Sequence, residues 1–310
     1  MNAQKTISPR AWAELILLAV IWGGSFLSTR LTLNEIPVVT TVLHRCGWAM
    51  LILWGVVLLR RLPIPRAPAV WLAFGVMGLA NNVVPFFLLT WAQKHVETGL
   101  VSILNAATAI FGVILAAMFF ADERLTPRKA IGVSLGFLGV ATALGFDAFH
   151  SFDLRSGAQL AVLGATVSYG LASCWARARL SHLPPQVSAA GMLTGSTLML
   201  LPLALLLDGP VRFDLAAETW VAVAYLSVFA TAGAFLLYYR VLSMAGSGNL
   251  MLVTLLVSPV AIVLGALVLG EELHARAYAG FALLALGLLI LNGTLRWPQQ
   301  RAIDPARPTD

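Results

Sequence analysis

Residues 97–144 read ETGLVSILNAATAIFGVILAAMFFADERLTPRKAIGVSLGFLGVATAL and contain two apolar runs separated by a short polar turn. The first run covers residues 99–120 and the second covers residues 130–144. A helix needs about 20 apolar residues to cross the hydrocarbon core of a bilayer. The two runs are together long enough for a helical hairpin through a membrane. This stretch therefore predicts a membrane protein built from helices.

The same pattern returns near the C-terminus, shifted by 148 residues (271 − 123). The matched pairs are Gly99 and Ser247, Glu123 and Glu271, Leu125 and Leu273, Gly132 and Gly280, and Gly139 and Gly287. Weaker matches with nearly the same shift continue through the first half, among them Trp22 with Tyr169 and Gly47 with Gly195. A nearly constant shift along the whole chain indicates a duplicated fold. We divide the chain into a first repeat, residues 1–150, and a second repeat, residues 151–310.

The composition is that of an integral membrane protein. The chain is 59% hydrophobic and 11% charged, with a mean hydropathy of +0.85, and a soluble chain of 310 residues needs far more polar surface. The net charge of +6 does not indicate nucleic-acid binding, because the charges form short clusters between apolar runs. Cys46 and Cys174 lie inside apolar runs, so we expect no structural disulfide. The first run lacks a small-residue cleavage site and is expected to be retained.

The apolar runs predict ten membrane-spanning helices joined by short loops. The expected windows are 11–29, 37–59, 69–91, 98–120, 128–146, 157–176, 187–207, 219–239, 248–269 and 276–295. The fold class is thus all-α integral membrane, with five helices in each repeat. The tail after Arg296 carries three prolines and is expected to be disordered.

Lys and Arg residues set the expected orientation, because cytoplasmic loops carry an excess of them. Fourteen fall on the side of the termini and five on the opposite side. We therefore expect both termini in the cytoplasm of an inner (plasma) membrane. Five helices per repeat is an odd number, so the second repeat must enter from the opposite side. Such inverted repeats are a transporter architecture, because two equivalent halves can rock around one central site.

Three features of the sequence resemble those of the drug/metabolite transporter superfamily. They are the Trp22–Gly23 pair in the first helix, Arg45 in the second, and the two hairpins that contain Glu123 and Glu271. The chain is most similar to the ten-helix type with two EamA repeats, and within it to bacterial amino-acid exporters, including the aromatic amino-acid branch. The resemblance implies alternating access. It also implies a central cavity lined mainly by the first, third, fourth, sixth, eighth and ninth helices.

Arg45 is the sharpest candidate for a binding residue, because polar residues inside a membrane are costly. It lies about eight residues into the second helix, roughly 12 Å along its axis. One interpretation is that its guanidinium meets a substrate carboxylate. The other is that it snorkels or binds helix-end carbonyls as a packing element. His44 is adjacent and shares a face with Trp48 at i and i+4. It is either a substrate ligand or a hydrogen-bonded structural group.

Other polar and aromatic residues within the spans are further candidates. Pro85 frees a backbone carbonyl in the third helix. Of the preceding amides, Asn81 and Asn82, we expect Asn82 to reach the cavity, although both could instead bond neighbouring helices. Trp22 and Tyr169 occupy matched positions in the two repeats, which favours them as binding residues. The predicted substrate-binding residues are Trp22, His44, Arg45, Asn82, Asn105, Tyr169, Thr231 and Ser258.

Small residues and turn carboxylates have mainly structural interpretations. Gly132 with Gly136, and Gly191 with Gly195, form GxxxG pairs that let helices approach closely. They are expected to pack within one chain, while a dimer face is the alternative. Glu123 and Glu271 lie at turns, where a carboxylate favours the N-terminus of the helix that follows. They are not assigned as proton carriers.

Missing motifs narrow the function. No Asp or Glu lies in the middle of a predicted span, although cationic-drug antiport usually needs a buried carboxylate. HExxH, GxSxG and Walker A motifs are also absent. The sequence therefore predicts a carrier, not an enzyme, that exports amino acids or similar small metabolites, acts as a facilitator, and needs no cofactor or metal. The expected partners are a small-molecule substrate and membrane lipid but no nucleic acid, and the chain is expected to be a monomer or weak dimer. The alternatives are a proton-coupled drug or nucleotide-sugar transporter and, from another class, a polytopic lipid-modifying enzyme.

Overall fold

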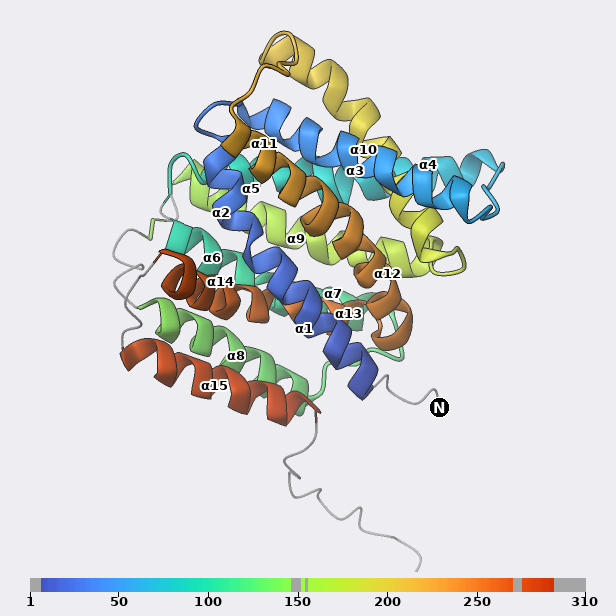
Figure 1. The fold of residues 1–310 in the computed structure, drawn as a ribbon. Coiled ribbons are helices and arrows are strands. Elements are labelled where there is room, and N and C mark those ends of the chain that lie inside the picture. Colours follow the sequence, from blue (N-terminus) through green and yellow to red (C-terminus); the bar gives the residue numbers. More distant parts are fainter. Residues whose placement is uncertain (1–6, 97, 146–151, 154–155, 270–274, 293–310) are drawn as a thin grey trace, which may run out of the picture.

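The computed structural model describes residues 7–96, 98–145, 152–153, 156–269 and 275–292. Every regular element within these ranges is a helix, and the helices form one bundle (Figure 1). Six helical stretches are long and apolar enough to cross a bilayer by length and composition: Pro9–Thr32, Val38–Leu59, Pro68–Ala92, Leu100–Phe119, Pro185–Leu207 and Ala217–Ala245. Shorter apolar helices accompany them. The all-α membrane fold is thereby confirmed.

In the first repeat, three of the five spans are divided into consecutive elements. The spans are α1 (Pro9–Gly23) with α2 (Ser25–Thr32); α3 (Val38–Leu59); α4 (Pro68–Gly78) with the π-helix η1 (Leu79–Val83) and α5 (Val84–Ala92); α6 (Thr98–Ala106) with α7 (Thr108–Phe119); and α8 (Pro127–Leu144).

The second repeat follows the same order, except that its first span, α9, is one unbroken helix. Its spans are α9 (Gly157–Arg179); α10 (Pro185–Leu207); α11 (Ala217–Ala224) with the π-helix η3 (Tyr225–Gly233) and α12 (Ala234–Ala245); α13 (Ser247–Leu250) with α14 (Val253–Leu269); and α15 (Ala275–Asn292). The eighth span is longer than its predicted window, 219–239, because the π-helix and α12 continue it to Ala245. The predicted boundary at 150/151, Glu271 and the tail after Arg296 lie outside the described residues.

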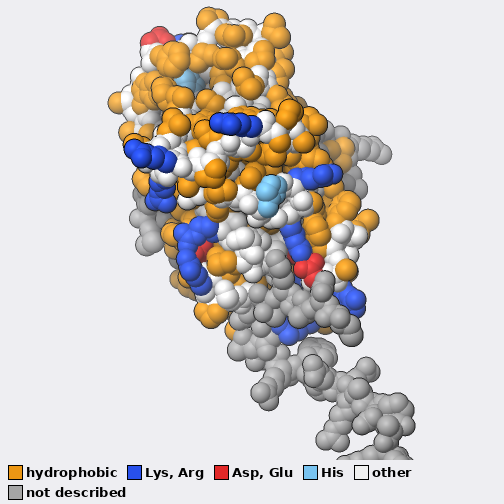
Figure 2. Space-filling view, turned by 90° about the vertical axis from the view of Figure 1, so that its right-hand side faces the viewer, with side chains coloured by type: hydrophobic (Ala, Val, Ile, Leu, Met, Phe, Trp, Pro, Cys, Tyr) orange, Lys and Arg blue, Asp and Glu red, His pale blue; other side chains and the backbone are white. Residues whose placement is uncertain are grey.

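The bundle has two ends, which we name by the helices there. The terminal end is where α1 begins and α15 ends, on the right in Figure 1, and the far end is opposite. Four helices that start at the terminal end have proline in their first turn: Pro9, Pro68, Pro127 and Pro185. Proline suits this position because its missing N–H has no partner in the helix anyway. Figure 2 looks onto the terminal end and shows Lys and Arg side chains spread across it.

The glycines that match between the repeats bring α8 and α15 into backbone contact. A Cβ added to Gly132 would lie 2.8 Å from the carbonyl oxygen of Gly287, and one added to Gly139 would lie 2.7 Å from that of Gly280. The order of these contacts makes the two helices antiparallel, as an inverted repeat requires. Gly195 meets the backbone of Gly75 in the same way, at 2.9 Å. Both GxxxG pairs therefore take part in packing within one chain.

Both repeats contain a π-helix at the matching place in their third span. A shift of 148 carries η1, residues 79–83, onto residues 227–231, which lie within η3. A π-helical segment disturbs the regular ladder and exposes carbonyls to other partners. In η1 the cause is visible: Pro85 has no N–H with which to bond the Ala80 carbonyl five residues earlier. The Ser168 hydroxyl donates to that carbonyl at 2.6 Å instead.

Carboxylates from one repeat cap helices of the other. Glu35 accepts a hydrogen bond from the Ala216 N–H before α11, and Asp208 accepts one from the Thr40 N–H at the start of α3, at 2.7 Å. Glu123, fully buried, accepts from the N–H groups of Ser247 and Gly248 at 2.8 and 2.7 Å. Its expected position at a helix N-terminus is correct, but the helix is α13 and not the following α8. The negative charge there favours the positive end of the α13 dipole.

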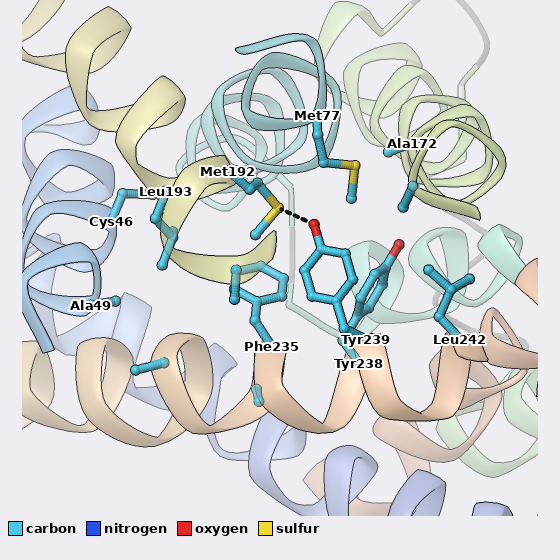
Figure 3. Close-up of a cluster of buried hydrophobic side chains, with 14 of the residues drawn as sticks. Cys46, Ala49, Met77, Ala172, Met192, Leu193, Phe235, Tyr238, Tyr239 and Leu242 are labelled. Atoms are coloured by element: carbon cyan, nitrogen blue, oxygen red, sulfur yellow. Dashed lines mark hydrogen bonds between the residues drawn. The ribbon is translucent and has the colours of Figure 1, made fainter. Parts of the chain in front are cut away.

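The main core lies where α3, α4, α10 and α12 meet. Figure 3 shows Met77, Met192 and Phe235 in one cluster of buried side chains between α4, α10 and α12. On α12, Tyr238 and Tyr239 lie next to each other, and the Tyr239 hydroxyl donates to Met192 Sδ at 3.5 Å. Tyr238, although almost fully buried, has a hydroxyl without a hydrogen-bond partner in the described part of the chain.

Candidate functional site

A central cavity of about 760 Å³, part of it open to solvent, lies between the spans. Its walls come from seven of the spans, which are the six that the resemblance implied together with α3. The lining residues are Trp22, Ser25, Phe26, Thr29, Arg45, Asn81, Phe86, Leu89, Thr90, Gln93, Asn105, Tyr169, Phe235, Tyr238, Met251, Val253, Thr254 and Val257. The cavity is therefore mostly apolar and aromatic, with a few polar groups, as ligand sites commonly are.

Arg45 is the one charged side chain among these lining residues. Its Nε donates to Thr231 Oγ1 at 2.8 Å and its Nη2 donates to the Ala230 carbonyl at 3.3 Å. The guanidinium lies 3.8 Å from the centre of the Phe86 ring, a cation–π contact. These contacts use two of its five N–H groups. The remaining N–H groups, on Nη1 and Nη2, form the end of the fork and can still receive a carboxylate.

The π-helix η3 is what makes room for this arrangement. The Ala230 carbonyl, which lies within η3, accepts from both Arg45 and the indole Nε1 of Trp22, the latter at 3.0 Å. Trp22 is thereby fixed against η3 while its ring lines the cavity beside Tyr238, at 6.5 Å between ring centroids. Tyr169, on α9, packs against Phe86 across the same cavity. Four predicted residues, Trp22, Arg45, Asn105 and Tyr169, thus line one space.

Four other predicted residues do not line the cavity. Asn82 is fully buried and donates to Ser196 Oγ at 2.8 Å, and its neighbour Asn81 lines the cavity instead. Thr231 lies behind Arg45 and accepts from it. Ser258 pairs with Ser102 at 2.5 Å between hydroxyl oxygens, joining α14 to α6. All three serve contacts between helices, which the sequence analysis had left as the alternative for the amides.

His44 also lies outside the cavity, on the side of α3 that faces α11 and the loop at 208–216. Its Nδ1 accepts from Trp48 Nε1 at 3.2 Å, so the ring proton is on Nε2, which donates to the Arg212 carbonyl. Phe213 and Trp220 pack edge-on against the ring. The structural interpretation of His44 is the one that fits. In the same loop, Arg212 hydrogen-bonds Asp214 and lowers the pKa of that carboxyl.

Gln93, Phe86 and Tyr238 also line the cavity and are not among the predicted binding residues. A signal existed for the first two. Phe86, Leu89, Thr90 and Gln93 recur at helical spacing and form one stripe on α5, and all four line the cavity. Tyr238 corresponds to Thr90 under the shift of 148 (238 − 90), so matched positions of the two repeats face the same space.

The terminal end is closed beneath the cavity by ion pairs. The Arg177 guanidinium bonds Glu123 and also Asp122, the latter at 2.5 Å, and lies over the Phe120 ring. Arg240 on α12 bonds Glu14 on α1 at 2.5 Å. The cavity lining, by contrast, reaches Thr29 and the end of α5 near the far end. The cavity lining therefore lies farther from the terminal end than these ion pairs do.

The part of the chain that the structure describes holds no group of three or more His, Cys, Asp or Glu side chains. The described residues that line the cavity include no carboxylate and no imidazole. The chemistry available in the cavity is one guanidinium together with amides, hydroxyls, an indole and apolar surface. This set can bind a small molecule through a carboxylate, hydrogen bonds and apolar contacts.

Comparisons with known proteins give a consistent picture. The model of the EamA-like transporter family matches the chain twice, over residues 11–145 and 156–293. A "Probable terminal-alkyne amino-acid exporter" of Streptantibioticus cattleyicolor is 27% identical over 97% of this chain and 99% of its own length. A "Probable amino-acid metabolite efflux pump" of Escherichia coli is 25% identical, with coverages of 91% and 94%. One crystal structure superposes with a TM-score of 0.75 at 18% identity, over 95% of this chain and 99% of its own, a likeness that concerns the fold.

Proposed function

The chain belongs to the EamA-like transporter family, and we propose that it exports amino acids or similar small metabolites by alternating access. The observation that carries this proposal is the cavity, in which Arg45 offers the free end of its fork to a carboxylate inside a mostly apolar chamber. The names of two relatives, an amino-acid exporter and an amino-acid metabolite efflux pump, favour the same class of substrate.

The inverted repeat supports the alternating-access part of the proposal, because each half can take the position of the other. The terminal end is tied by the Arg177 and Arg240 ion pairs, while the cavity lining reaches Thr29 and the end of α5, nearer the far end. With the terminal end in the cytoplasm of an inner membrane, this arrangement is an outward-open state. Reporter fusions after Arg66 and Arg179 should then report cytoplasm, and a fusion after Asp153 the outside. A reversed pattern contradicts this orientation.

The absence of a carboxylate or imidazole among the described lining residues favours a facilitator. Burial raises the pKa of a carboxyl and makes it a proton carrier at neutral pH, and the described cavity offers no such group. A proton-coupled drug or nucleotide-sugar transporter is the alternative, and it lacks this support. The family and the cavity also favour transport over catalysis by a lipid-modifying enzyme, and they call for no cofactor.

The test is efflux of labelled amino acids from proteoliposomes that hold the purified protein, with a protein-free liposome as control. We expect apolar amino acids to leave faster than from control liposomes, and the rate to persist when an ionophore collapses the pH gradient. If no member of the panel moves, the proposed substrate class is wrong. If flux stops with the pH gradient while the substrate gradient remains, the facilitator mechanism is wrong and proton coupling takes its place.

A further inference from the structure

The cavity gathers most of the unpartnered buried polar atoms of the described chain. Five buried side-chain atoms have no hydrogen-bond partner there, and three of them, Gln93 Oε1, Asn105 Oδ1 and the Tyr238 hydroxyl, belong to cavity-lining residues. Each such atom lowers the stability of the folded protein when nothing bonds it. Their collection around one space indicates that a ligand supplies the missing partners.

Asn105 is the best placed of the three to meet a substrate that Arg45 holds. Both residues lie seven positions from the far-end start of their helices, α3 at Val38 and α6 at Thr98. At a rise of 1.5 Å per residue, each lies about 10 Å below the far end, so the two are at a similar depth. Gln93, at the end of α5, lies nearer the far end, and Tyr238 lies closer to the terminal end.

Local structure holds the Asn105 side chain in place. The residue is 7% exposed and lies in the last turn of α6, just before the break at Ala107. Its carbonyl accepts from the Thr108 hydroxyl at 2.7 Å, which fixes the backbone at the break. Because Oδ1 bonds no other group in the described chain, the amide does not join helices as Asn82 does. The amide oxygen is therefore available to a molecule in the cavity.

Resting on the proposed function, we propose that Asn105 accepts a hydrogen bond from the amino group of the substrate while Arg45 binds its carboxylate. The substrate class is then a zwitterionic amino acid with a free amino group and an apolar side chain. Its ammonium is balanced by its own carboxylate, so a neutral amide oxygen is a sufficient partner. An organic cation without a carboxylate would face Arg45 with no described acidic group nearby, and is excluded on charge.

The test compares two amino acids with their des-amino analogues, leucine with isocaproate and phenylalanine with hydrocinnamate, in binding to the purified, monodisperse full chain. Asn105→Leu removes the amide at similar volume and should weaken amino-acid binding about ten- to hundredfold, the effect of one hydrogen bond to a charged group. It should leave binding of the analogues unchanged. Asn105→Asp keeps an oxygen acceptor and should retain amino-acid binding while rejecting the analogues, since they have no ammonium to balance the added carboxylate.

Thr197→Val is the matched control, because Thr197 Oγ1 is also buried and unpartnered but does not line the cavity. It should change no affinity. If Asn105→Leu weakens acid and analogue equally, or weakens neither, Asn105 does not contact the amino group and the inference is overturned. If the unaltered protein binds analogues as tightly as amino acids, the inference is overturned as well. If it binds none of the four ligands, the proposed function itself fails.

Discussion

The two π-helices occupy matching places in the two repeats, yet the side chains that bond them differ. At η3, the Ala230 carbonyl receives the indole of Trp22 and the guanidinium of Arg45, and both of these side chains line the cavity. At η1, the Ala80 carbonyl accepts from the Ser168 hydroxyl, and the carbonyl of Gly78, just before η1, accepts from the Ser196 hydroxyl. Neither serine lines the cavity.

The difference teaches that the duplicated backbone supplied the same π-helical defect twice, and that only the copy at η3 holds side chains that line the cavity. Under the shift of 148, the position of Arg45 corresponds to Leu193, which is fully buried. Most of the polar lining residues, including Arg45, Asn81, Gln93 and Asn105, belong to the first repeat. The fold is thus nearly symmetric, while the chemistry of the cavity is not. Substitutions at three positions test this distinction.

Removing the charge of Arg45 should have the largest effect, and it should fall on binding. Arg45→Gln should weaken binding of a free amino acid by about 1.5–3 kcal/mol, the value of a charge-assisted hydrogen bond, or about ten- to hundredfold. Its amidated form, which has no carboxylate, should bind almost as before. Arg45→Lys should rescue only partly, because an ammonium lacks the bidentate fork. The measurement is affinity by calorimetry or fluorescence on purified protein.

Stability provides the second readout for Arg45. An arginine in the middle of a span costs about 2.5–3.5 kcal/mol of insertion free energy. Arg45→Leu, which copies the residue of the second repeat, should therefore leave the melting temperature unchanged or raise it, even though Thr231 loses a donor. A lower yield of folded protein together with equal weakening of free and amidated ligands would assign Arg45 to packing. Leu193, at the matching position of the second repeat, is buried in this way.

Ser196→Ala should show the opposite behaviour, with the effect on stability. Ser196 on α10 accepts from Asn82 in η1 and donates to the carbonyl of Gly78, the last residue of α4. Its loss leaves the buried Asn82 amide unsatisfied, which costs about 1–3 kcal/mol. Thermal unfolding in detergent should shift to lower temperature, while the affinity of the remaining folded protein should be unchanged. A loss of affinity without a loss of stability would mean that the η1 side also contributes to binding.

Tyr238→Phe should have the smallest effect of the three, and the property measured is stability. The hydroxyl has no partner in the described chain, so its removal should leave the ligand-free protein as stable as before or slightly more stable, by less than about 1 kcal/mol. Tyr239→Phe on the same helix is the matched control, since it loses a bond to Met192. A clear fall in melting temperature for Tyr238→Phe would reveal a partner for this hydroxyl in the folded protein.

The fold class could be read from the sequence because it depends on quantities that local sequence controls. The apolar runs were long enough to span a bilayer, and no other structure satisfies backbone groups inside one as well as a helix. The shift of 148 revealed the repeat, and its odd number of helices implied inversion. The same shift located Gly132, Gly139, Gly280 and Gly287, which meet across α8 and α15. Arg45 is the single charged residue in its apolar run, which made it a candidate binding residue.

Which neighbouring polar residue faces the cavity was decided by the tertiary structure alone. Successive residues on an α-helix differ by about 100° around its axis, and a π-helical segment changes that angle where Asn81 and Asn82 lie. The sequence favoured Asn82, whereas the structure places Asn81 in the cavity lining. The partners of Glu123, at Ser247 and Arg177, and those of His44, at Arg212 and Trp48, lie on helices and loops whose placement follows from packing. Sequence alone determined what the membrane demands of each segment, whereas the contacts between distant segments determined which side chains were left free to bind.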